Sequence, residues 1–595
     1  MIDITNYIFL NNIFQIFFFF GIFNISIFIL KFINKNEKIV FDINYFWLIS
    51  FIFVLISSIF SFYYLFFKVN HNFILLLIYT TVLYGFIFYI KNFSKIQKFI
   101  FNFKFKILEV FLLLFFISFF LLSLAPPTDI DSIDYHLGAP LNWYNNFGYY
   151  QRYDWLHYRI AGLGENLNLI GIYLKTYNIG QLFQFFGLVL AILFGSKYLN
   201  NKEHKTIFYF LILSCPLLIF LVSTQKFQLF PSSLIFCSII YSIYEKKIKN
   251  TELIFIIFCL AFTVGCKFSF ILPASIAWLI IFKKCYDNKK ILNLFVISLV
   301  AFFVVIYPLI LKNYMFYGDP FSPLFENFKR TPDETILNFL EYNKNFAADR
   351  NNLIFLFNLF IPRHIGALSE VLGLLPLVIF FINFRKIDKK SLNIIYLISL
   401  LSILIFFSYK GFGRYYLEIF FLISFFISKN FDLLKFKIFF KRLIIIQSIL
   451  IFFVVLFGVT NLTYGIFSKK LYANVLKKNS YGYNVANWVK DNTKEIKNNE
   501  KILLNDVRFY SFFNNKYVSN QYYQFSNKEK SIPFSIEGNI KYILYTADHS
   551  NFLENINNCL NFTEKKEKTF TLNTRNPLNK KTIKYYLLTI SRESC

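Results

Sequence analysis

The chain has 595 residues, of which 56% are hydrophobic, 22% aromatic and only 16% charged, against about 25% charged residues in an ordinary soluble domain. This composition excludes a disordered, a fibrous and a nucleic-acid-coating protein. The formal net charge of +28 would indicate a polyanionic partner if the basic residues formed one patch. They lie instead in short clusters between apolar runs of about 17 to 25 residues, the pattern of a polytopic helical membrane protein.

A hydropathy window of about 19 residues locates fourteen apolar segments in chain order. They cover residues 8–31, 45–67, 73–90, 107–125, 181–198, 206–224, 231–244, 252–266, 270–282, 291–311, 365–384, 391–408, 415–428 and 443–466. The segments 231–244, 252–266 and 415–428 are short for a perpendicular crossing of a hydrocarbon core of about 30 Å, so each could be a broken or re-entrant helix. We predict an all-α polytopic membrane protein with about 14 transmembrane helices.

Lys and Arg residues are concentrated in alternate connections, which predicts the orientation of the chain. The rich connections contain Lys31, Lys35 and Lys38; Lys91, Lys95, Lys98, Lys104 and Lys106; Lys197, Lys202 and Lys205; Lys246, Lys247 and Lys249; Lys283, Lys284, Lys289 and Lys290; Arg385, Lys386, Lys389 and Lys390; and Lys429, Lys435, Lys437, Lys441 and Arg442. The intervening short connections contain only Lys68, Lys226, Lys267, Lys410 and Arg414. The rich side is therefore expected in the cytoplasm, with both termini on the outer side of the membrane.

Three polar stretches are too long to be turns, and the predicted topology places all of them on the outer side: 126–180, 312–364 and 467–595. We therefore expect three domains: N-terminal transmembrane helices at 1–106, a second transmembrane module at 107–466 with the outer loops 126–180 and 312–364, and an outer domain at 467–595.

The last stretch combines one helical pattern with several strand-like runs. The helical pattern covers 481–492, and the runs cover 501–505, 540–545 and 583–590, where β-branched and aromatic residues are frequent. A small C-terminal α/β domain is expected. Its two cysteines, Cys559 and Cys595, would be free to pair in an oxidising compartment, although two unpaired thiols are the alternative. No Cys or His set has zinc-ligand spacing, so no metal site is predicted.

Three carboxylates follow the stiff Pro126-Pro127 pair at a predicted membrane boundary: Asp129, Asp131 and Asp134. Asp131 and Asp134 are three residues apart and would share one face of a helix. Repulsion and partial burial can raise the pKa of one acid toward that of a usable general base. An acidic, solvated loop is the alternative.

At these residues the sequence resembles the C-type (GT-C) membrane glycosyltransferase superfamily, and within it the bacterial protein mannosyltransferases and lipid A aminoarabinose transferases. In that family an outer loop carries an acidic pair, and the first acid lies four residues before an aromatic residue, as Asp131 does before Tyr135. The second acid would fall at Ser132, so Asp129 or Asp134 would replace it. The resemblance implies that Asp131 is the catalytic base, supported by Asp134 or Asp129.

Further motifs of the same family occur in order along residues 107–470. The run 260–273 resembles the family's helix with a lysine near its outer end, here Lys267, and this lysine faces the lipid-phosphate donor in relatives. Lys226 lies in a short polar outer loop, Lys312 opens an element resembling basic-Asn-Tyr followed by Gly-Asn-Pro, and Arg414 begins an Arg-Tyr-x-Leu element. These four cations are expected beside the donor phosphate, where positive charge stabilises a leaving oxygen. Snorkelling side chains at the ends of spans are the alternative.

The stretch 149–165 is rich in aromatic and hydrogen-bonding side chains, which suits an acceptor or sugar wall. With the preceding acidic loop it supplies the predicted substrate-binding residues Tyr135, His136, His157, Arg159 and Glu165. An amphipathic helix lying in the membrane interface is the alternative. No serine-hydrolase elbow and no Walker or Rossmann glycine pattern occurs.

The resemblance implies transfer of a sugar from a polyprenyl-phosphate carrier to a lipid or glycan acceptor at the outer face of a bacterial inner membrane. The module at 107–466 would then be catalytic, and the domain at 467–595 and both termini would be periplasmic. The expected partners are this donor, the acceptor and membrane lipids, without nucleic acid, and no cofactor is identified. The alternative is a transporter or flippase of a lipid-linked sugar, which would keep its ionisable residues near the bilayer midplane. A scaffold whose outer domain binds a partner is a third interpretation.

The charge asymmetry gives a direct test of topology. Reporters fused after Lys98, Lys247 and Lys389 are expected to report the cytoplasm, and those fused after Asn145 and Asn520 the outer compartment. Paired alkaline phosphatase and fluorescent-protein fusions would measure this. A cytoplasmic signal at Asn520 would contradict both the topology and the side of the membrane assigned to the site.

Overall fold

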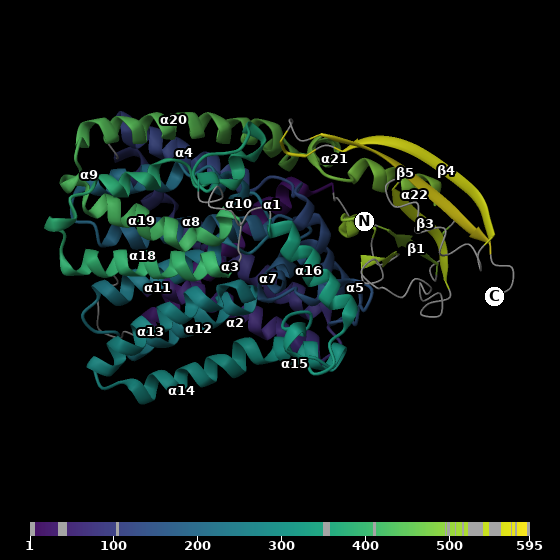
Figure 1. Cartoon of the computed structure of the whole chain (residues 1–595), viewed down its shortest axis with the longest axis horizontal. Helices are drawn as coiled ribbons and strands as arrows, with labels where there is room; N and C mark the ends of the chain where they lie inside the picture. The colour runs from purple at the N-terminus through teal and green to yellow at the C-terminus, as the bar shows by residue number, and fades with distance from the viewer. Residues whose placement is uncertain are drawn as a thin grey trace.

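A computed structural model shows a long bundle of helices with a small β-sheet at one end (Figure 1). The structure describes residues 6–33, 44–102, 106–348, 357–408, 412–493, 496, 500–505, 507–513, 517–521, 539–546, 561–572, 574–576 and 580–591. Cys559 and Cys595 lie outside these ranges, so their pairing stays a prediction. The helical membrane protein with a small C-terminal α/β part that the sequence predicts is confirmed.

The helices of the bundle follow one another with short connections. Their bounds are α1 Ile8–Ile33, α2 Asn44–Phe66, α3 His71–Asn102, α4 Ile107–Ser123, α5 Leu137–Asn145, α6 Leu156–Arg159, α7 Leu163–Leu174, α8 Ile179–Lys197, α9 Lys202–Leu213, α10 Leu217–Val222, α11 Leu229–Tyr244, α12 Asn250–Cys266, α13 Ile271–Asp287, α14 Ile291–Ala301, α15 Tyr307–Tyr317, α16 Glu334–Ala348, α18 Lys389–Phe407, α19 Leu417–Lys429 and α20 Lys437–Leu462. The C-terminal part adds α21 Lys469–Asn479 and α22 Tyr483–Asn492.

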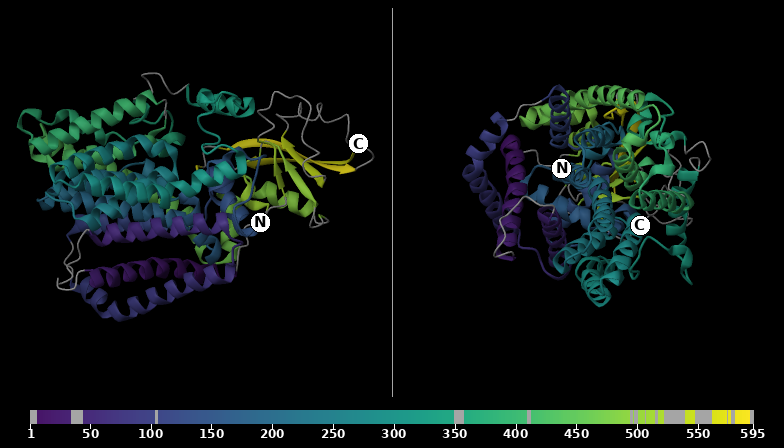
Figure 2. Two further views of the ribbon diagram at one scale, coloured as in Figure 1. Left: turned by 90° about the horizontal axis from the view of Figure 1, so that it is seen from below. Right: turned by 90° about the vertical axis from the view of Figure 1, so that its left-hand side faces the viewer.

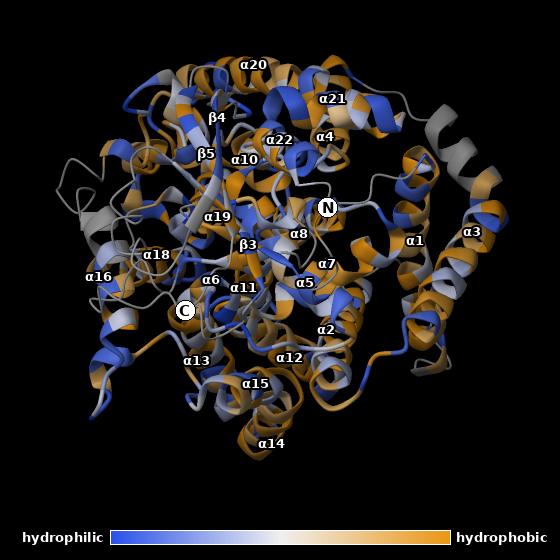
Figure 3. Ribbon diagram, turned by 90° about the vertical axis from the view of Figure 1, so that its right-hand side faces the viewer, coloured by the Kyte–Doolittle hydropathy of each residue, from blue (hydrophilic) through white to orange (hydrophobic). Residues whose placement is uncertain are grey.

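Eight helices in the described residues are long and apolar enough to cross a membrane. They are Ile8–Phe32, Asn44–Phe66, His71–Phe93, Ile179–Lys197, Phe268–Asp287, Ile291–Tyr317, Lys389–Phe407 and Lys437–Ile466, and each contains or overlaps a predicted span. Three shorter apolar helices, α4, α11 and α12, also coincide with predicted spans. In Figure 3 the peripheral helices α14 and α20 are mostly hydrophobic, whereas strand β4 is mostly hydrophilic. The chain is a multi-pass membrane protein.

Two predicted spans differ from continuous helices. The segment 206–224 divides into α9 and α10 at Pro216, because proline lacks the N–H group that a continuing helix needs and clashes with the preceding turn. The segment 365–384 forms short 3₁₀ helices, η5 (Ile365–Glu370) and η6 (Leu375–Phe381). Gly373 lies between them at φ 86°, a left-handed conformation that ends a helix.

The predicted outer loop 126–180 is largely helical and folds into the bundle. Every residue of α7 is buried, and this helix contacts α2, α5 and α8. Hydrogen bonds tie it to α2: Asn166 donates to Ser61 Oγ at 2.6 Å, and Ser57 donates to the carbonyl of Leu163 at 2.7 Å. The segment is therefore a wall of the bundle and not a solvated loop.

The sheet has five strands in the order β2-β1-β3-β5-β4. Their bounds are β1 Lys501–Leu504, β2 Tyr517–Ser519, β3 Ile540–Thr546, β4 Asn561–Leu572 and β5 Lys581–Ser591. Strand β1 runs parallel to β2 and β3, and β5 runs antiparallel to β3 and β4, with Leu544 opposite Leu587. The three predicted strands and the helix α22 are confirmed, whereas the highly charged β4 had no apolar pattern to reveal it.

An ion pair and an aromatic cluster join the sheet to the bundle. Arg152 donates two hydrogen bonds to Asp154, at 2.8 and 2.7 Å, and Asp154 also accepts the backbone N–H of Ser519 at 2.7 Å. Trp155, fully buried, packs against Tyr510 with ring centroids 4.7 Å apart. These contacts place the sheet directly over the end of the bundle that carries the acidic segment.

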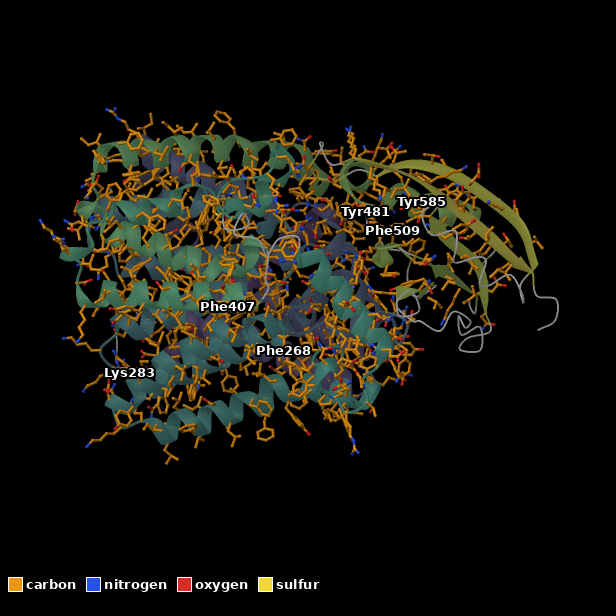
Figure 4. All side chains as sticks on the ribbon, in the orientation of Figure 1. Phe268, Lys283, Phe407, Tyr481, Phe509 and Tyr585 are labelled. Atoms are coloured by element: carbon orange, nitrogen blue, oxygen red, sulfur yellow. The ribbon has the colours of Figure 1, made fainter. Side chains whose placement is uncertain are left out.

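The predicted cytoplasmic and outer ends separate in space. Lys283, from a lysine-rich connection, lies at the end of the bundle opposite the sheet, while Tyr481, Phe509 and Tyr585 lie at the sheet end (Figure 4). The first helix begins at the sheet end (Figure 2). The lysine-rich connection and the sheet thus lie at opposite ends of the bundle, as the charge asymmetry predicts. Which end faces the periplasm stays a prediction.

Candidate active site

The acidic segment after α4 ends in a single π-helical turn, η1 (Ser132–His136). Asp129 begins it, because its Oδ1 accepts the backbone N–H of Ser132 at 3.0 Å. Ser132, in turn, accepts the backbone N–H of Gln225 at 2.8 Å. Single π-turns widen a helix locally and are frequent at functional sites. The wide turn is anchored on both sides, so the carboxylates next to it have defined positions.

Asp131 lies between two cations from distant parts of the chain. Its Oδ2 accepts from Lys226 Nζ at 2.7 Å, and its Oδ1 accepts from Arg508 Nη2 at 2.9 Å. Burial of Asp131 favours the neutral acid, but Lys226, Arg508 and Arg414 outweigh it and hold the pKa of the carboxyl well below its usual range. The expectation that repulsion raises this pKa is therefore wrong for Asp131. Cations surround it, and the carboxylate is ionised.

Asp134 is fully buried beside Asp131 and shares its arginine. Its Oδ2 accepts from Arg508 Nε at 3.0 Å and lies 3.2 Å from His157 Nδ1. His157 also lies 2.7 Å from Gln521 Nε2 and donates its backbone N–H to Gln521 Oε1. The predicted pairing of the two acids on one face is seen in the structure, and a planar guanidinium bridges them with two N–H groups.

Lys226 is held by a hydrogen-bonded loop between α10 and α11. Gln184 of α8 accepts the backbone N–H groups of Gln228, Leu229 and Phe230 at 3.4, 2.7 and 3.1 Å, and its Nε2 donates to the carbonyl of Lys226 at 2.7 Å. These three N–H groups open α11 and would otherwise be unsatisfied. Gln184 is thus both a cap for α11 and the support of the lysine loop.

Lys267 and Arg414 form a second cationic group around Tyr415. Lys267 Nζ lies 5.0 Å from the centroid of the Tyr415 ring, and the Arg414 guanidinium lies 5.4 Å from it. No carboxylate within the described residues makes an ion pair with either cation. Burial lowers the pKa of Lys267 to about 7. Burial of Tyr415 acts in the opposite direction to the charges of Lys267, Arg414 and Lys226, which together lower its pKa to about 6.

The position of Arg414 depends on its backbone. The carbonyl of Arg414 accepts from Gln228 Nε2 at 3.1 Å. Glu418, one turn later, accepts from Ser232 Oγ of α11 at 2.7 Å. Both contacts tie the short helix η8 (Gly413–Tyr416) to the start of α11, so Lys226 and Arg414 are supported by the same element.

The predicted substrate-binding residues lie on two sides of the acids. Tyr135 stacks on His157, with centroids 5.4 Å apart. His136 Nδ1 pairs with Glu165 Oε1, and Glu165 Oε2 accepts the backbone N–H of Gly162 at 2.7 Å, so Glu165 caps α7. Tyr135 and His157 face the acid cluster, while the buried His136–Glu165 pair connects η1 to α7.

Two predicted residues are not brought to the acids. Lys312 donates to the carbonyl of Ala161 at 3.0 Å and lies 5.4 Å from the Tyr149 ring centroid. Arg159 donates to Ser322 Oγ at 3.3 Å and to the carbonyl of Tyr153 at 3.1 Å. Both side chains join the segment 149–162 to the region around α15, which is a structural position.

Two arginines of the C-terminal part were absent from the sequence-based site. Arg508 bridges Asp131 and Asp134, and Arg575 donates to Asp129 Oδ2 at 2.6 Å and to Thr128 Oγ1 at 2.8 Å. Neither belongs to a motif, and each is separated from its acid by several hundred residues. The one signal in the sequence was the cluster of carboxylates at 126–134 on the predicted outer side, because buried carboxylates require cations as partners. Among the described residues no group of three His, Cys, Asp or Glu side chains is arranged to hold a metal ion.

A family model described as the DUF1420 N-terminal domain matches residues 2–476. The chain belongs to this family. The matched region of the DUF1420 chain contains the bundle and every predicted site residue, and it ends before Arg508, Arg575 and the sheet. None of the curated proteins matches the chain.

Two solved structures are similar to this DUF1420 chain over 80% of its length and 96% of theirs. ArnT from Cupriavidus metallidurans in the apo state aligns at 10% identity with a TM-score of 0.47, and ArnT bound to undecaprenyl phosphate aligns at 8% with a TM-score of 0.42. At these identities and TM-scores no residue role or substrate is carried over to the DUF1420 chain.

Lys267 and Tyr415 predict how anion binding depends on pH. As pH rises from about 5.5 to 8, Tyr415 gains a negative charge near its pKa of about 6 and Lys267 loses its positive charge near about 7. Both changes weaken the attraction for a phosphate. The affinity for dihexyl phosphate, a phosphodiester that keeps a single negative charge over this range, is expected to fall, as measured by isothermal titration.

Two variants of the DUF1420 chain separate the contributions. Lys267→Arg keeps its charge over the whole range and is expected to remove the fall in affinity near pH 7. Tyr415→Phe cannot gain a negative charge and is expected to remove the fall near pH 6. An affinity that is constant between pH 5.5 and 8 in the unaltered protein would contradict the assignment of these two groups to an anion site.

Proposed function

We propose that this protein transfers a sugar from a polyprenyl-phosphate donor to a lipid or glycan acceptor at the outer face of a bacterial inner membrane, with both termini on that side. The observation that carries the proposal is the position of Asp131. This ionised carboxylate contacts Lys226 on one side, and Lys267 and Arg414, which have no carboxylate partner in the described part of the chain, lie nearby.

The cations suit the leaving group of such a reaction. An acceptor hydroxyl attacks the anomeric carbon, the bond from that carbon to the phosphate oxygen breaks, and the phosphate keeps the electron pair. Arg414 can bind two phosphate oxygens with its planar fork, while Lys226 and Lys267 supply point charges. Preorganised cations in a water-poor site stabilise the charge that develops on the leaving oxygen.

Asp131 suits the acceptor side. The acceptor hydroxyl becomes strongly acidic as its oxygen bonds to carbon. The lowered pKa makes Asp131 a weak base, and its ionised carboxylate takes the proton late in this step, once the new bond is largely formed. Asp134 is fully buried and bound by Arg508 and His157, so its role in the proposal is to position Arg508 and through it Asp131. A single displacement of this kind would invert the configuration at the anomeric carbon.

The placement of the charges favours the transferase over the transporter. A transporter would carry its ionisable groups near the middle of the bilayer. Asp129, Asp131 and Asp134 instead follow the last turn of α4 and contact two arginines of the C-terminal part. The cluster thus lies at the sheet end of the bundle.

Asp131 provides the sharpest test of the enzyme. Asp131→Asn is expected to reduce the rate of sugar transfer by about 10² to 10⁴, the usual contribution of a general base, while the protein still inserts in the membrane. Asp134→Asn should reduce it less, because it acts through Arg508. The measurement is formation of the modified lipid or glycan, followed by mass spectrometry of envelope extracts.

Asp432→Asn is the matched control, because it makes the same substitution at an exposed carboxylate that pairs with Lys437 outside the site. If Asp131→Asn, Asp134→Asn and Asp129→Asn all transfer sugar at the normal rate, none of the three acids is the base. If the unaltered protein forms no modified lipid or glycan, the glycosyltransferase proposal is wrong and the transporter takes precedence.

Arg414 tests the donor side. Arg414→Ala is expected to abolish transfer, and Arg414→Lys to lose most of it because an ammonium cannot reproduce the two-pronged contact. Affinity for dodecyl phosphate should fall in both variants. Lys283→Ala, which removes a cation at the opposite end of the bundle, serves as the control. Normal transfer and affinity in Arg414→Ala would remove Arg414 from the donor site.

A further inference from the structure

A cavity of about 660 Å³ lies between α4, α10, α20, η5 and the segment 574–576. This volume is in the range of small-molecule and cofactor pockets, about 300 to 1,000 Å³. Its walls are mainly apolar, with Leu122, Ile219, Phe220, Leu368, Val454 and Phe457 among them. The cavity thus has the lining expected for a hydrocarbon chain.

The cavity opens toward the surrounding membrane. Phe457, which lines it, is 51% exposed on α20. Leu450 and Phe453, on the preceding turns of α20, are 61% and 63% exposed, and α20 belongs to a helix apolar enough to cross the bilayer. A chain could therefore enter sideways from the hydrocarbon region.

The other end of the cavity is polar and reaches the catalytic segment. Asp129 and Ile130 line it, and Asp131 is the next residue. The segment 574–576 covers this end, because Arg575 bonds Thr128 and Asp129 while Asn576 donates to the carbonyl of Gly366 at 2.8 Å. A molecule whose chain fills the cavity would present its head group beside Asp129 and Ile130, which directly precede Asp131 in the chain.

The charges at this end do not suit a phosphate. Arg575 is the one cation among the described residues that line the cavity, and its guanidinium is already engaged by Asp129, Thr128 and Ser223. Lys226 and the cations around Tyr415 are not part of the lining. An anionic head group at this end would lie near the Asp129 carboxylate with no further cation to stabilise it. Hydroxyl groups, in contrast, could form hydrogen bonds with the polar lining residues.

We propose that this cavity holds the hydrocarbon chain of the acceptor, and that the acceptor is therefore a membrane lipid whose head group is uncharged and bears hydroxyl groups. The inference rests on the proposed function, since it assigns the acceptor of that reaction. It places the acceptor chain in the α4–α10–α20 cavity and leaves the donor phosphate to Lys226, Lys267 and Arg414.

The test is photolabelling of the purified full chain with two probes that share one chain. Dodecyl glucoside and dodecyl phosphate, each with a diazirine at the end of the chain, are compared, and labelled peptides are mapped by mass spectrometry. The glucoside probe is expected to label α10 or α20 at the cavity saturably and at least about tenfold more than the phosphate probe, a difference of about 1.4 kcal/mol.

Gly458 allows the cavity to be filled. A Cβ at this lining position would lie 3.4 Å from Leu122 Cδ1, an ordinary contact, so Gly458→Phe adds its ring without an imposed clash at Cβ. It is expected to remove most of the labelling by dodecyl glucoside. Leu450→Phe, on the exposed face of the same helix, is the matched control and should label normally. Val454→Trp is a second filling variant should Gly458→Phe fail to fold.

Two outcomes would overturn the inference. Equal or stronger labelling of the cavity by dodecyl phosphate would assign it to the donor chain, and labelling that is unsaturable or unchanged in both filling variants would make it a groove for bulk lipid. Because photolabelling requires no sugar transfer, a failure of the proposed function would appear in the Asp131→Asn assay and not in this one.

Discussion

The compensation of three carboxylates by cations from distant parts of the chain organises the functional end of this protein. Asp129, Asp131 and Asp134 lie within one short segment, and each would be expensive to bury alone. Lys226 reaches Asp131 from the membrane bundle, while Arg508 and Arg575 come from the C-terminal part. The acids thus hold together three regions that the chain order separates.

This arrangement gives the C-terminal part a role beyond that of an appended domain. Arg152, Asp154 and Trp155 dock the sheet on the bundle, and the docked sheet delivers Arg508 to the two central acids. Truncation near residue 476, where the family match ends, would leave Asp134 buried without its arginine. The bundle supplies the candidate chemistry, and the sheet completes its charge balance.

Charge also separates the two sides of Asp131. Lys267 and Arg414 have no carboxylate partner in the described residues, whereas the cation at the end of the α4–α10–α20 cavity is fully engaged. Lys226, Lys267 and Arg414 outnumber the anions Asp131 and Tyr415 on the first side, whereas acids match the arginine on the second, so the two environments favour different head groups. A donor phosphate on one side and an uncharged acceptor on the other would meet at the carboxylate between them.

The sequence by itself determined the class of the protein, most of its spans, three of its strands and the segment that carries the acids, because hydropathy, strand patterns and charge asymmetry are local properties. It also indicated Lys226, Lys267 and Arg414 through short motifs. It also proposed Lys312 and Arg159, whose side chains bond to backbone or side-chain groups between 149–162 and α15 in the structure. Only the tertiary structure decided that Arg508 and Arg575 pair with the acids, that Asp131 is held ionised instead of having a raised pKa, and that a cavity leads from the membrane to Asp129. These features depend on contacts between residues hundreds of positions apart, and no local pattern records which charges meet.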